Sequence, residues 1–454
     1  MTKTIHPVLK KIASIFNAKG KQIYLVGGAV RDMLRGEKIN DWDLATDALP
    51  EETSAVIKNA GGKVFPTGIK HGTVTAFYKK HSAEITTFRT ESGYTDGRRP
   101  DQVHYATNVE EDLSRRDFTM NAVAMRLPDG KIIDPFGGKA DIKAGVIRCV
   151  GNAAERFSED GLRPLRAVRF ASQLGFEIEK NTLAATGGAL DVSAKVSKER
   201  VRDEIDKILE SPLPSRAFLL MEKTGLLKLF LEELAACRGI DQKGFHRFDV
   251  LDHSLLACDF TAANDYSLEL RLAALLHDIG KPCVRKMDES GVWTFYRHEE
   301  ISAGMCRKIL SRLRYPNAVI DSVCHLVKEH MFHYTDEWKD SAVRSFIARA
   351  GESNLENLYR LRRADAYAFT GKEADSSSLL LLANRVDKVL AQGRAFTVKD
   401  LAVSGKDLIA AGIESGKTMG IILNELLETV LDDPSQNTKE KLLEIAGKIY
   451  RQRS

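Results

Sequence analysis

Two neighbouring stretches decide the fold: residues 25–32, LVGGAVRD, and residues 40–47, NDWDLATD. The apolar run at residues 23–26 predicts a short strand, the glycines at 27 and 28 break it, and the residues that follow predict a helix. A strand that enters a helix through glycines gathers free backbone N–H groups and the positive end of the helix dipole. This arrangement attracts phosphate, and Arg31 on the first helical turn adds a charge-assisted contact.

Asp41 and Asp43 follow this turn with one residue between them. In an extended segment their side chains point to the same face, about 6.6 Å apart. Two carboxylates on one face can bind Mg²⁺, and two metal ions about 3.5–4 Å apart can hold the attacking and leaving oxygens of a phosphoryl transfer. The alternative is a polar turn in which an Asn or Asp caps a helix.

A third acid, Glu84, lies in AEITTFR, beside the strand predicted at residues 85–88; another strand is predicted at residues 74–78. A carboxylate buried within an apolar strand needs a partner or a metal ion, because an isolated buried charge is very costly. We therefore expect Glu84 to be a buried third metal ligand. The alternative is a strand whose solvated face carries Glu84 and Thr86.

The segment RRDFTMNAVAM places Arg115, Arg116, Asp117 and Asn121 at the start of a predicted helix. Guanidinium groups at this position can hold a triphosphate, and the Asn121 amide can hydrogen-bond a ribose hydroxyl. A capped helix with surface arginines is the alternative.

The composition is that of an ordinary globular protein: 454 residues, 43 % hydrophobic and 29 % charged. These values exclude long disorder, a collagen-like repeat and a coiled-coil rod. A net charge of +4 argues against a uniformly basic DNA coat protein but permits local basic stripes. Six scattered cysteines without a CxxC motif fit reduced thiols. The sequence has neither a signal-peptide core nor a membrane-length apolar run, so we expect a cytoplasmic protein with no membrane partner.

Five segments in this order, GGAVRD, DWDLATD, EITTFR, RRDFTMNA and DPFGG, resemble the head domain of the class II tRNA nucleotidyltransferases. This family comprises the CCA-adding enzymes and the related bacterial poly(A) polymerases. The segments SEDGLRPLRAVRFASQLGF and KERVRDEI continue the resemblance into the helical part. The resemblance implies that Asp41 and Asp43 hold Mg²⁺, with Glu84 as the third catalytic acid. It also implies a nucleotide site and, at RTESGYTDGRRPD, the flexible loop used in switching from C to A. The nucleotide-binding residues that it implies are Gly28, Arg31 and Arg116.

The segment around Pro164 has its own physical interpretation. Proline is tolerated near a helix start, which predicts a helix from about residues 160–163 to Gly175. Asp160 offers acceptors and Arg163 offers donors, so together they can match the Watson–Crick edges of cytosine and adenine and leave uracil and guanine unmatched. The resemblance assigns this base-selecting role to the same two residues, and nucleotide contact to arginines such as Arg166 and Arg169. An Asp–Arg pair that merely stabilises the helix is the alternative.

Downstream, LRLAALLHDIGKP ends in adjacent His277 and Asp278 and resembles the HD phosphohydrolase domain. Histidine and carboxylate suit transition metals or Mg²⁺, and a bound metal can generate a hydroxide nucleophile. The resemblance implies a second divalent metal and activity on 2′,3′-cyclic phosphate ends. Structural histidines are the alternative. The candidate ligands are His253, His277 and Asp278 first, then His298, His330 and Asp365, with His325 also nearby.

The sequence therefore predicts an α+β protein: a small α/β head followed by a long, mostly helical body. We expect a nucleotidyltransferase head at residues 1–150, a neck for base selection and tRNA binding at 151–245, an HD-type domain at 246–370 and a helical tail at 371–454. The predicted function is Mg²⁺-dependent, template-free addition of C, C and A to the 3′ acceptor end of tRNA from CTP and ATP, with no DNA partner. The alternatives are a poly(A) polymerase, an enzyme that adds only CC or only A, and an HD-type phosphohydrolase with an RNA-binding head.

Overall fold

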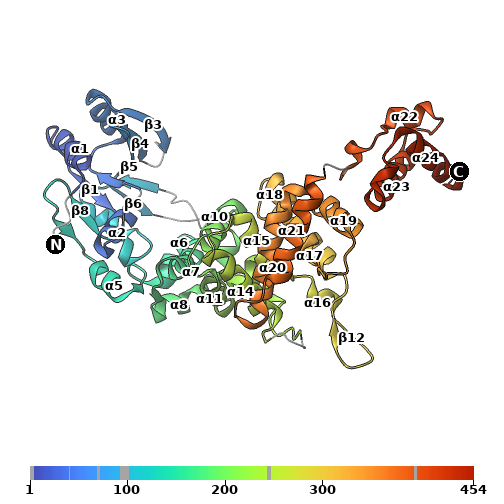
Figure 1. Ribbon diagram of the computed structural model, residues 1–454. Coiled ribbons are helices and arrows are strands. Elements are labelled where there is room, and N and C mark those ends of the chain that lie inside the picture. The colour runs from blue at the N-terminus through green and yellow to red at the C-terminus, as the bar shows by residue number, and fades with distance from the viewer. Residues whose placement is uncertain are drawn as a thin grey trace. The chain divides into compact units, whose positions relative to one another are not determined.

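The computed structural model describes residues 5–39, 41–68, 72–92, 102–242, 247–392 and 396–453. The chain divides into two compact units, Met1–Ala236 with Arg312–Tyr315, and Cys237–Ser311 with Pro316–Ser454. The first unit carries the large sheet and the neck helices, and the second is almost entirely helical (Figure 1). This mixture of a sheet-bearing head and a helical body is the α+β class that the sequence predicts.

A seven-stranded sheet with the order β3-β4-β5-β2-β1-β8-β9 organises the head. Strand β2 runs parallel to β5, and the other pairs are antiparallel. A separate two-stranded ribbon pairs β6 with β7. The strands are β1 (Ile23–Val26), β2 (Asp43–Thr46), β3 (Lys63–Gly68), β4 (Thr73–Tyr78), β5 (His81–Thr87), β6 (Arg89–Ser92), β7 (Gln102–Tyr105), β8 (Ala124–Arg126) and β9 (Ile132–Ile133).

At its centre this sheet is buried on both faces, because alternate residues of β1 and β2 enter two different cores. Leu25, Leu44 and Ile85 belong to the larger core, whereas Tyr24 and Ala45 belong to the smaller one. The helices of the head are α1 (Pro7–Asn17), α2 (Gly28–Arg35), α3 (Pro50–Asn59), α4 (Val109–Ser114) and α5 (Gly138–Ala144).

Two details of the head differ from the sequence predictions. Strand β5 begins at His81 and ends at Thr87, so it starts before the predicted residues 85–88. The helix predicted at RRDFTMNAVAM is wrong: a single 3₁₀ turn, η2 (Thr119–Asn121), is followed by strand β8. The apolar residues of this segment pair with β1 and β9, and this sheet pairing overrides the helical pattern. Residues 93–101 of the predicted C-to-A loop lie outside the described residues.

The neck confirms the helix predicted around Pro164. Helix α7 runs from Arg163 to Leu174, with the proline in its first turn and the left-handed Gly175 as its C-cap. The remaining neck elements are β10 (Val146–Ile147), α6 (Ala153–Glu159), β11 (Glu177–Ile178), α8 (Lys180–Gly188), α9 (Leu190–Ala194), α10 (Lys198–Leu209), α11 (Pro214–Thr224), α12 (Leu226–Phe230) and α13 (Glu232–Ala235).

The second unit is built from packed helices, with one small hairpin of β12 (Lys286–Met287) and β13 (Trp293–Thr294). No helix among the described residues has the length and apolar character needed to span a membrane. The helices are α14 (Val250–Ala263), α15 (Leu268–Leu276), α16 (Lys281–Val284), α17 (His298–Arg312), α18 (Asn317–Glu329), α19 (Asp340–Ala350), η3 (Glu352–Asn354), α20 (Leu355–Thr370), α21 (Ser377–Ala391), η4 (Val398–Asp400), α22 (Gly405–Ala410), α23 (Lys417–Asp432), η5 (Pro434–Gln436) and α24 (Lys439–Arg453).

Candidate functional sites

The acids of the head lie on two adjacent strands. Asp43 opens β2 and is the register partner of Glu84 on the parallel strand β5. Partners across a sheet point to the same face, so the two carboxylates are neighbours. Burial raises the pKa of Asp43 above its ordinary value; Arg116 opposes this shift, and the nearby carboxylates of Glu84 and Asp41 add to it. Three neighbouring carboxylates, two of which raise the pKa of the third, are a donor set suited to a divalent cation.

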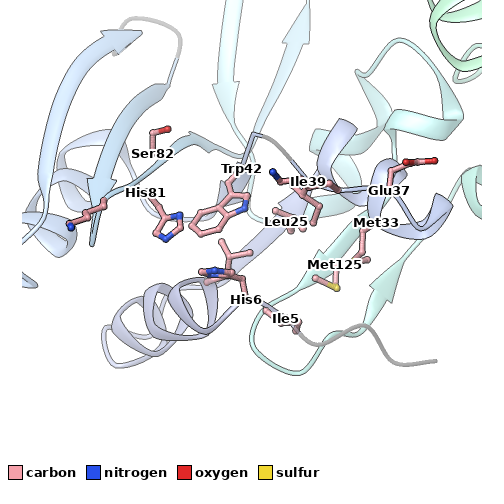
Figure 2. A pocket seen from close by; sticks show the side chains of 13 residues that line it. Ile5, His6, Leu25, Met33, Glu37, Ile39, Trp42, His81, Ser82 and Met125 are labelled. Carbon is pink, nitrogen blue, oxygen red and sulfur yellow. The ribbon is translucent and has the colours of Figure 1, made fainter. Parts of the chain in front are cut away.

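These acids face outward rather than inward. Asp41 and Glu84 are exposed and Asp43 is half-buried, so the prediction of a buried Glu84 is wrong. The alternation of the strand explains the difference, because Ala83 and Ile85 on either side of Glu84 enter the core. Alternation likewise turns Trp42 to the opposite face of the sheet from Asp43. There it packs among apolar residues such as Leu25 (Figure 2). The acids are therefore accessible to a substrate.

The glycine turn places a guanidinium group beside the acids. Gly27 has φ +66°, and a Cβ at this position would lie 3.0 Å from Arg116 Nη1 and 3.7 Å from Asp43 Oδ2. A side chain here would therefore be strained and would displace the Arg116 guanidinium. Helix α2 begins at Gly28, the next residue, so its free N–H groups lie next to Arg116 and Asp43.

Arg31 and Arg116 are positioned by partners that the sequence analysis did not single out. Nε and Nη2 of Arg31 donate to the two oxygens of Asp32 at 2.9 and 3.1 Å. Nη2 of Arg116 donates to the buried Asp112 at 3.1 Å. The spacing of Asp112 four residues before Arg116 within a helical segment was a readable signal for this pair.

Asn121 is buried and both ends of its amide are engaged by the protein. Its Oδ1 accepts a hydrogen bond from Arg31 Nη1 at 2.9 Å, and its Nδ2 donates to Asp117 at 3.0 Å. The structure thus joins Arg31 and Asn121, two of the predicted nucleotide-binding residues, to Asp117 in one network in which Asn121 holds Arg31. Its expected contact with a ribose hydroxyl stays a prediction.

The same network continues into the neck through Arg166. Nε and Nη2 of Arg166 donate to Asp117 Oδ2 at 2.9 and 2.7 Å. Although burial acts in the opposite direction, Arg166 and the Asn121 amide hold the pKa of Asp117 far below its ordinary value. Arg169, the second of the arginines assigned to nucleotide contact, is buried against Glu204, with its guanidinium 3.8 Å from the centre of the Phe170 ring. Its contacts are therefore within the protein interior rather than with solvent.

Asp160 and Arg163 lie together at the start of α7, but they bind other partners. Arg163 donates to the carbonyl oxygens of Arg156 and Arg115 at 2.6 and 3.2 Å. Asp160 accepts from Nη1 and Nη2 of Arg200 at 3.2 and 2.9 Å. Among the described contacts the two side chains form no ion pair with each other, so the helix-stabilising alternative is not supported. Arg200 lies in KERVRDEI, forty residues away, and no local pattern announced this contact.

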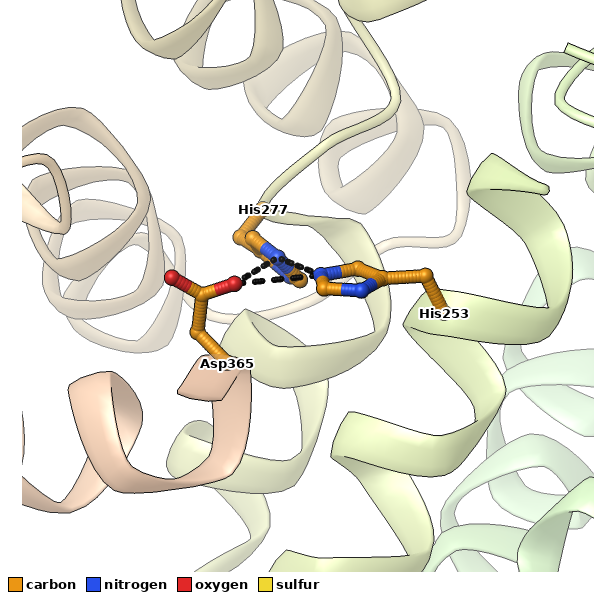
Figure 3. Close-up of side chains that lie close together, drawn as sticks. All are labelled: His253, His277 and Asp365. Carbon is orange, nitrogen blue, oxygen red and sulfur yellow. Dashed lines mark hydrogen bonds and ion pairs between the residues drawn. The ribbon is translucent and has the colours of Figure 1, made fainter. Parts of the chain in front are cut away.

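In the second unit, six residues that can bind metal converge from α14, α15, α17, α18, α20 and the turns next to them. His253 Nε2 lies 3.2 Å from His277 Nε2 and 3.1 Å from Asp365 Oδ1 (Figure 3). His277 Nε2 lies 3.2 Å from Asp278 Oδ2. Ligand atoms about 2.1 Å from one tetrahedral ion are about 3.4 Å apart, so these spacings match a coordination sphere. Two overlapping groups can each hold an ion: His253, His277 and Asp365, and His277, Asp278 and His330.

Hydrogen bonds to backbone carbonyls fix which imidazole nitrogen of these histidines faces the centre of the cluster. Nδ1 of His277, His298 and His330 lies 2.8, 2.9 and 2.7 Å from the carbonyl oxygen of the residue three positions earlier. An Nδ1–H that donates to a carbonyl leaves the Nε2 lone pair free, which is the tautomer that binds metal. All three Nε2 atoms lie within ion-pair distance of Asp278. The donor set therefore fits a divalent ion.

Residues around this cluster hold the carboxylates and bring the helices together. Lys281 Nζ lies 2.6 Å from Asp278 Oδ2 and Arg362 Nη1 lies 2.6 Å from Asp365 Oδ2. A Cβ at Gly280 would lie 2.7 Å from the His298 carbonyl oxygen, so this glycine permits the close approach of α17. His325 lies outside the cluster: its Nε2 is hydrogen-bonded to the Ala350 carbonyl at 2.6 Å, which makes it a structural histidine.

Three family models match the chain. The poly A polymerase head domain matches residues 23–148, the probable RNA and SrmB-binding site of polymerase A matches residues 175–238, and a putative tRNA nucleotidyltransferase domain 2 matches residues 287–446. The first match contains all three acids and the glycine turn, and the third contains part of the histidine cluster.

Full-length relatives and solved structures agree with these matches. The chain is 36 % identical to the CCA-adding enzyme of Lactobacillus johnsonii, over 96 % of this chain and 95 % of the relative. It is 32 % identical to that of Enterococcus faecalis, over 98 % and 96 %. The structure resembles the crystal structure of Bacillus stearothermophilus CCA-adding enzyme in complex with CTP, with a TM-score of 0.71, 31 % identity and 99 % of both chains covered. The Thermotoga maritima CCA-adding enzyme complexed with tRNA shares the fold, with a TM-score of 0.58 and 21 % identity.

Proposed function

The chain belongs to the family of the CCA-adding enzymes, and we propose that Asp41, Asp43 and Glu84 form the active site at which it works. It is a nucleotidyltransferase that adds C, C and A to the 3′ end of tRNA from CTP and ATP. The observation that carries the assignment of the site is the register of Asp43 with Glu84 beside the N-terminus of α2. We further propose that the protein works in the cytoplasm, on the tRNA and nucleotides present there.

Members of this family depend on a divalent metal, and we propose Mg²⁺ held by Asp41 and Asp43. Mg²⁺ prefers a few carboxylates together with substrate phosphates, and these outward-facing acids leave room for the phosphates. When bound, the metal promotes attack by the tRNA 3′ hydroxyl on the α-phosphate and neutralises charge on the departing pyrophosphate. Arg116, the N–H groups at the start of α2 and Arg31 bind the triphosphate chain, and Glu84 adds the third carboxylate from the adjacent strand.

The test is to sequence the ends made on a tRNA transcript that lacks CCA, with CTP and ATP both supplied. We expect one C, C and A on each molecule. Long A tails would assign a poly(A) polymerase, and ends with only CC or only A would assign a partial enzyme. The Asp41→Ala/Asp43→Ala variant should abolish addition, whereas Glu51→Ala, which removes an exposed acid from the same head, should not. Addition by the double variant would show that these acids are not the active site.

We propose that Asp160 and Arg163 select the incoming base, as the acceptor and the donor that cytosine and adenine match. The contact of Arg200 with both oxygens of Asp160 supports this role, because it orients the carboxylate that has to meet the base. Asp160→Ala should raise UTP addition relative to CTP by at least about tenfold. Arg200→Lys keeps the charge but loses the pair of hydrogen bonds to both oxygens of Asp160, so it should shift the ratio of UTP to CTP addition in the same direction. Arg202→Lys is the matched control and should leave the ratio unchanged, because Arg202 is equally half-buried on the same helix but donates to Asp203 and the Arg314 carbonyl.

The histidine cluster favours a second candidate function, a metal-dependent phosphohydrolase in the body. The converging Nε2 atoms and the short spacings to Asp278 and Asp365 support it. The full-length protein should retain a stoichiometric divalent metal after dialysis, measured by mass spectrometry, and should open a 2′,3′-cyclic phosphate at an RNA end. His253→Ala should lose the metal and this hydrolysis but keep CTP addition, whereas His325→Ala should keep all three. If the parent protein retains no metal after dialysis, the proposal is wrong and the histidine cluster has only a structural role.

A further inference from the structure

A cavity lies behind the acids, on the opposite face of the large sheet. Trp42 lies between Asp41 and Asp43 in the chain, so its indole enters the core while their carboxylates face solvent. Around this indole the described residues line a cavity of about 610 Å³ that is open to solvent on one side. Protein interiors have few voids larger than a water molecule, whereas organic ligands occupy cavities of about 300–1,000 Å³. The size is therefore that of a ligand site rather than of a packing defect.

The lining of this back-face cavity suits an aromatic ring. His81 stacks on Trp42 with ring centroids 4.7 Å apart and an interplanar angle of 14°, and His6 lies 5.0 Å from Trp42. The three rings form one end of the cavity, and the thioether side chains of Met33 and Met125 lie towards the other end (Figure 2). Thioether sulfurs and aromatic rings both make favourable contacts with an aromatic ligand.

The charge of the lining favours an anion. Lys38 and Lys80 are exposed at the cavity, and Glu37 is the one acid among its lining residues. The imidazoles of His6 and His81 add ring nitrogens that can donate hydrogen bonds. An anionic group at this rim gains attraction in surroundings of lower dielectric constant than bulk water.

We propose that the back-face cavity is a binding site for a small aromatic anion. The ring system lies against Trp42 and the methionines, and the charges of Lys38 and Lys80 at the rim attract the anionic group. The inference does not depend on the assignment of the active site, because neither the ring cluster nor the two lysines belong to it.

The probe for the test is 1-anilinonaphthalene-8-sulfonate, an aromatic sulfonate that fluoresces when it enters apolar surroundings. The full-length protein should bind it saturably at one site. Lys38→Glu/Lys80→Glu should weaken binding by about tenfold at low salt, because it replaces two attractive charges by repulsive ones. Lys19→Glu/Lys58→Glu makes the same change in net charge at exposed positions of the same head that do not line the cavity, and it should leave the affinity unchanged. Equal affinities of the two double variants would overturn the proposal, as would the absence of saturable binding.

A second measurement locates the probe. The chain has three tryptophans, Trp42, Trp293 and Trp338. A variant with Trp293→Phe and Trp338→Phe keeps only Trp42, and its emission should be transferred to the bound probe. Strong binding without quenching of Trp42 would put the probe elsewhere and overturn the proposal. Circular dichroism of every variant verifies that it is folded.

Discussion

The head and the helical body each gather groups that can bind metal, but in opposite surroundings. Asp41 and Glu84 are exposed at the face of a sheet, whereas His277 and Asp278 are 0 % and 1 % exposed among helices. In the head only carboxylates are supplied, so the phosphates of a substrate have to complete the coordination. In the body imidazoles and carboxylates already lie at ligand-to-ligand distances. We therefore expect the head to bind a metal that arrives with its substrate, and the body to bind a resident one.

The largest effect is expected at Asp43. Asp43→Asn should lower the rate of CTP addition by at least about a thousandfold, about 4 kcal/mol of transition-state stabilisation, because the metal-binding charge is lost. The variant should unfold at the parent's temperature or above, since the change removes repulsion from Glu84 and Asp41. Single-turnover kinetics and thermal unfolding measure the two effects. A large loss of stability would mean that Asp43 mainly supports the fold. This result would contradict the contrast between the head site and the body site.

Asp278→Asn should give the reverse pattern. This carboxylate is buried between His277, His298 and Lys281, so its removal leaves buried positive charge without its partner. We expect a loss of about 3 kcal/mol in the free energy of unfolding, measured by urea denaturation, with CTP addition retained per folded molecule. The exposed pair is the control: Asp340→Asn removes a partner of Arg385 and should cost less than about 1 kcal/mol.

Removal of metal should separate the two sites further. A resident ion at a concentration one hundred times its dissociation constant stabilises the fold by about 2.7 kcal/mol. A chelator should therefore lower the unfolding temperature of the parent protein, and it should leave that of His253→Ala unchanged. Equal responses of the two proteins would assign the stabilising metal to another place in the chain.

The smallest effect concerns pH in the metal-free protein. The pKa of Asp43 is raised in the folded chain, so below its unfolded value of 3.8 the group does not affect stability. As the pH rises through the raised pKa, the folded state has to lose a proton that it holds more tightly than the unfolded state, and stability falls. Asp43→Asn should lack this part of the fall in stability with rising pH. Thermal unfolding with chelator present, from pH 4 to pH 7, compares the two proteins; parallel curves would contradict the expected crowding of the acids.

Local sequence patterns predicted the fold correctly where the residues of a segment themselves determine its structure. Gly27, Pro164 and Gly175 set a turn, a helix start and a helix end, and the structure confirms the helix that the last two bound. The helix predicted at RRDFTMNAVAM failed because pairing with β1 and β9, which are distant in sequence, decides the structure of that segment. The exposure of Glu84 also depends on neighbouring strands, which a single strand does not reveal.

The residues of the candidate sites also divide into those that the local sequence predicts and those that depend on distant contacts. Asp41, Asp43 and the His277–Asp278 pair could be chosen from their spacing and their chemistry. The contact between Arg200 and Asp160 and that between Arg166 and Asp117 could not, because each joins elements about forty to fifty residues apart. Such contacts exist only once the helices have packed, and the residue types alone do not specify which arginine meets which acid.

The alternation of Asp41, Trp42 and Asp43 also protects the sheet from misassembly. A slip of β2 by one residue against its neighbours would exchange its two faces, turning the indole into water and pressing two carboxylates into hydrocarbon. The shifted arrangement is heavily disfavoured before any substrate is present. The two acids proposed for the active site thus also specify the register of this strand during folding.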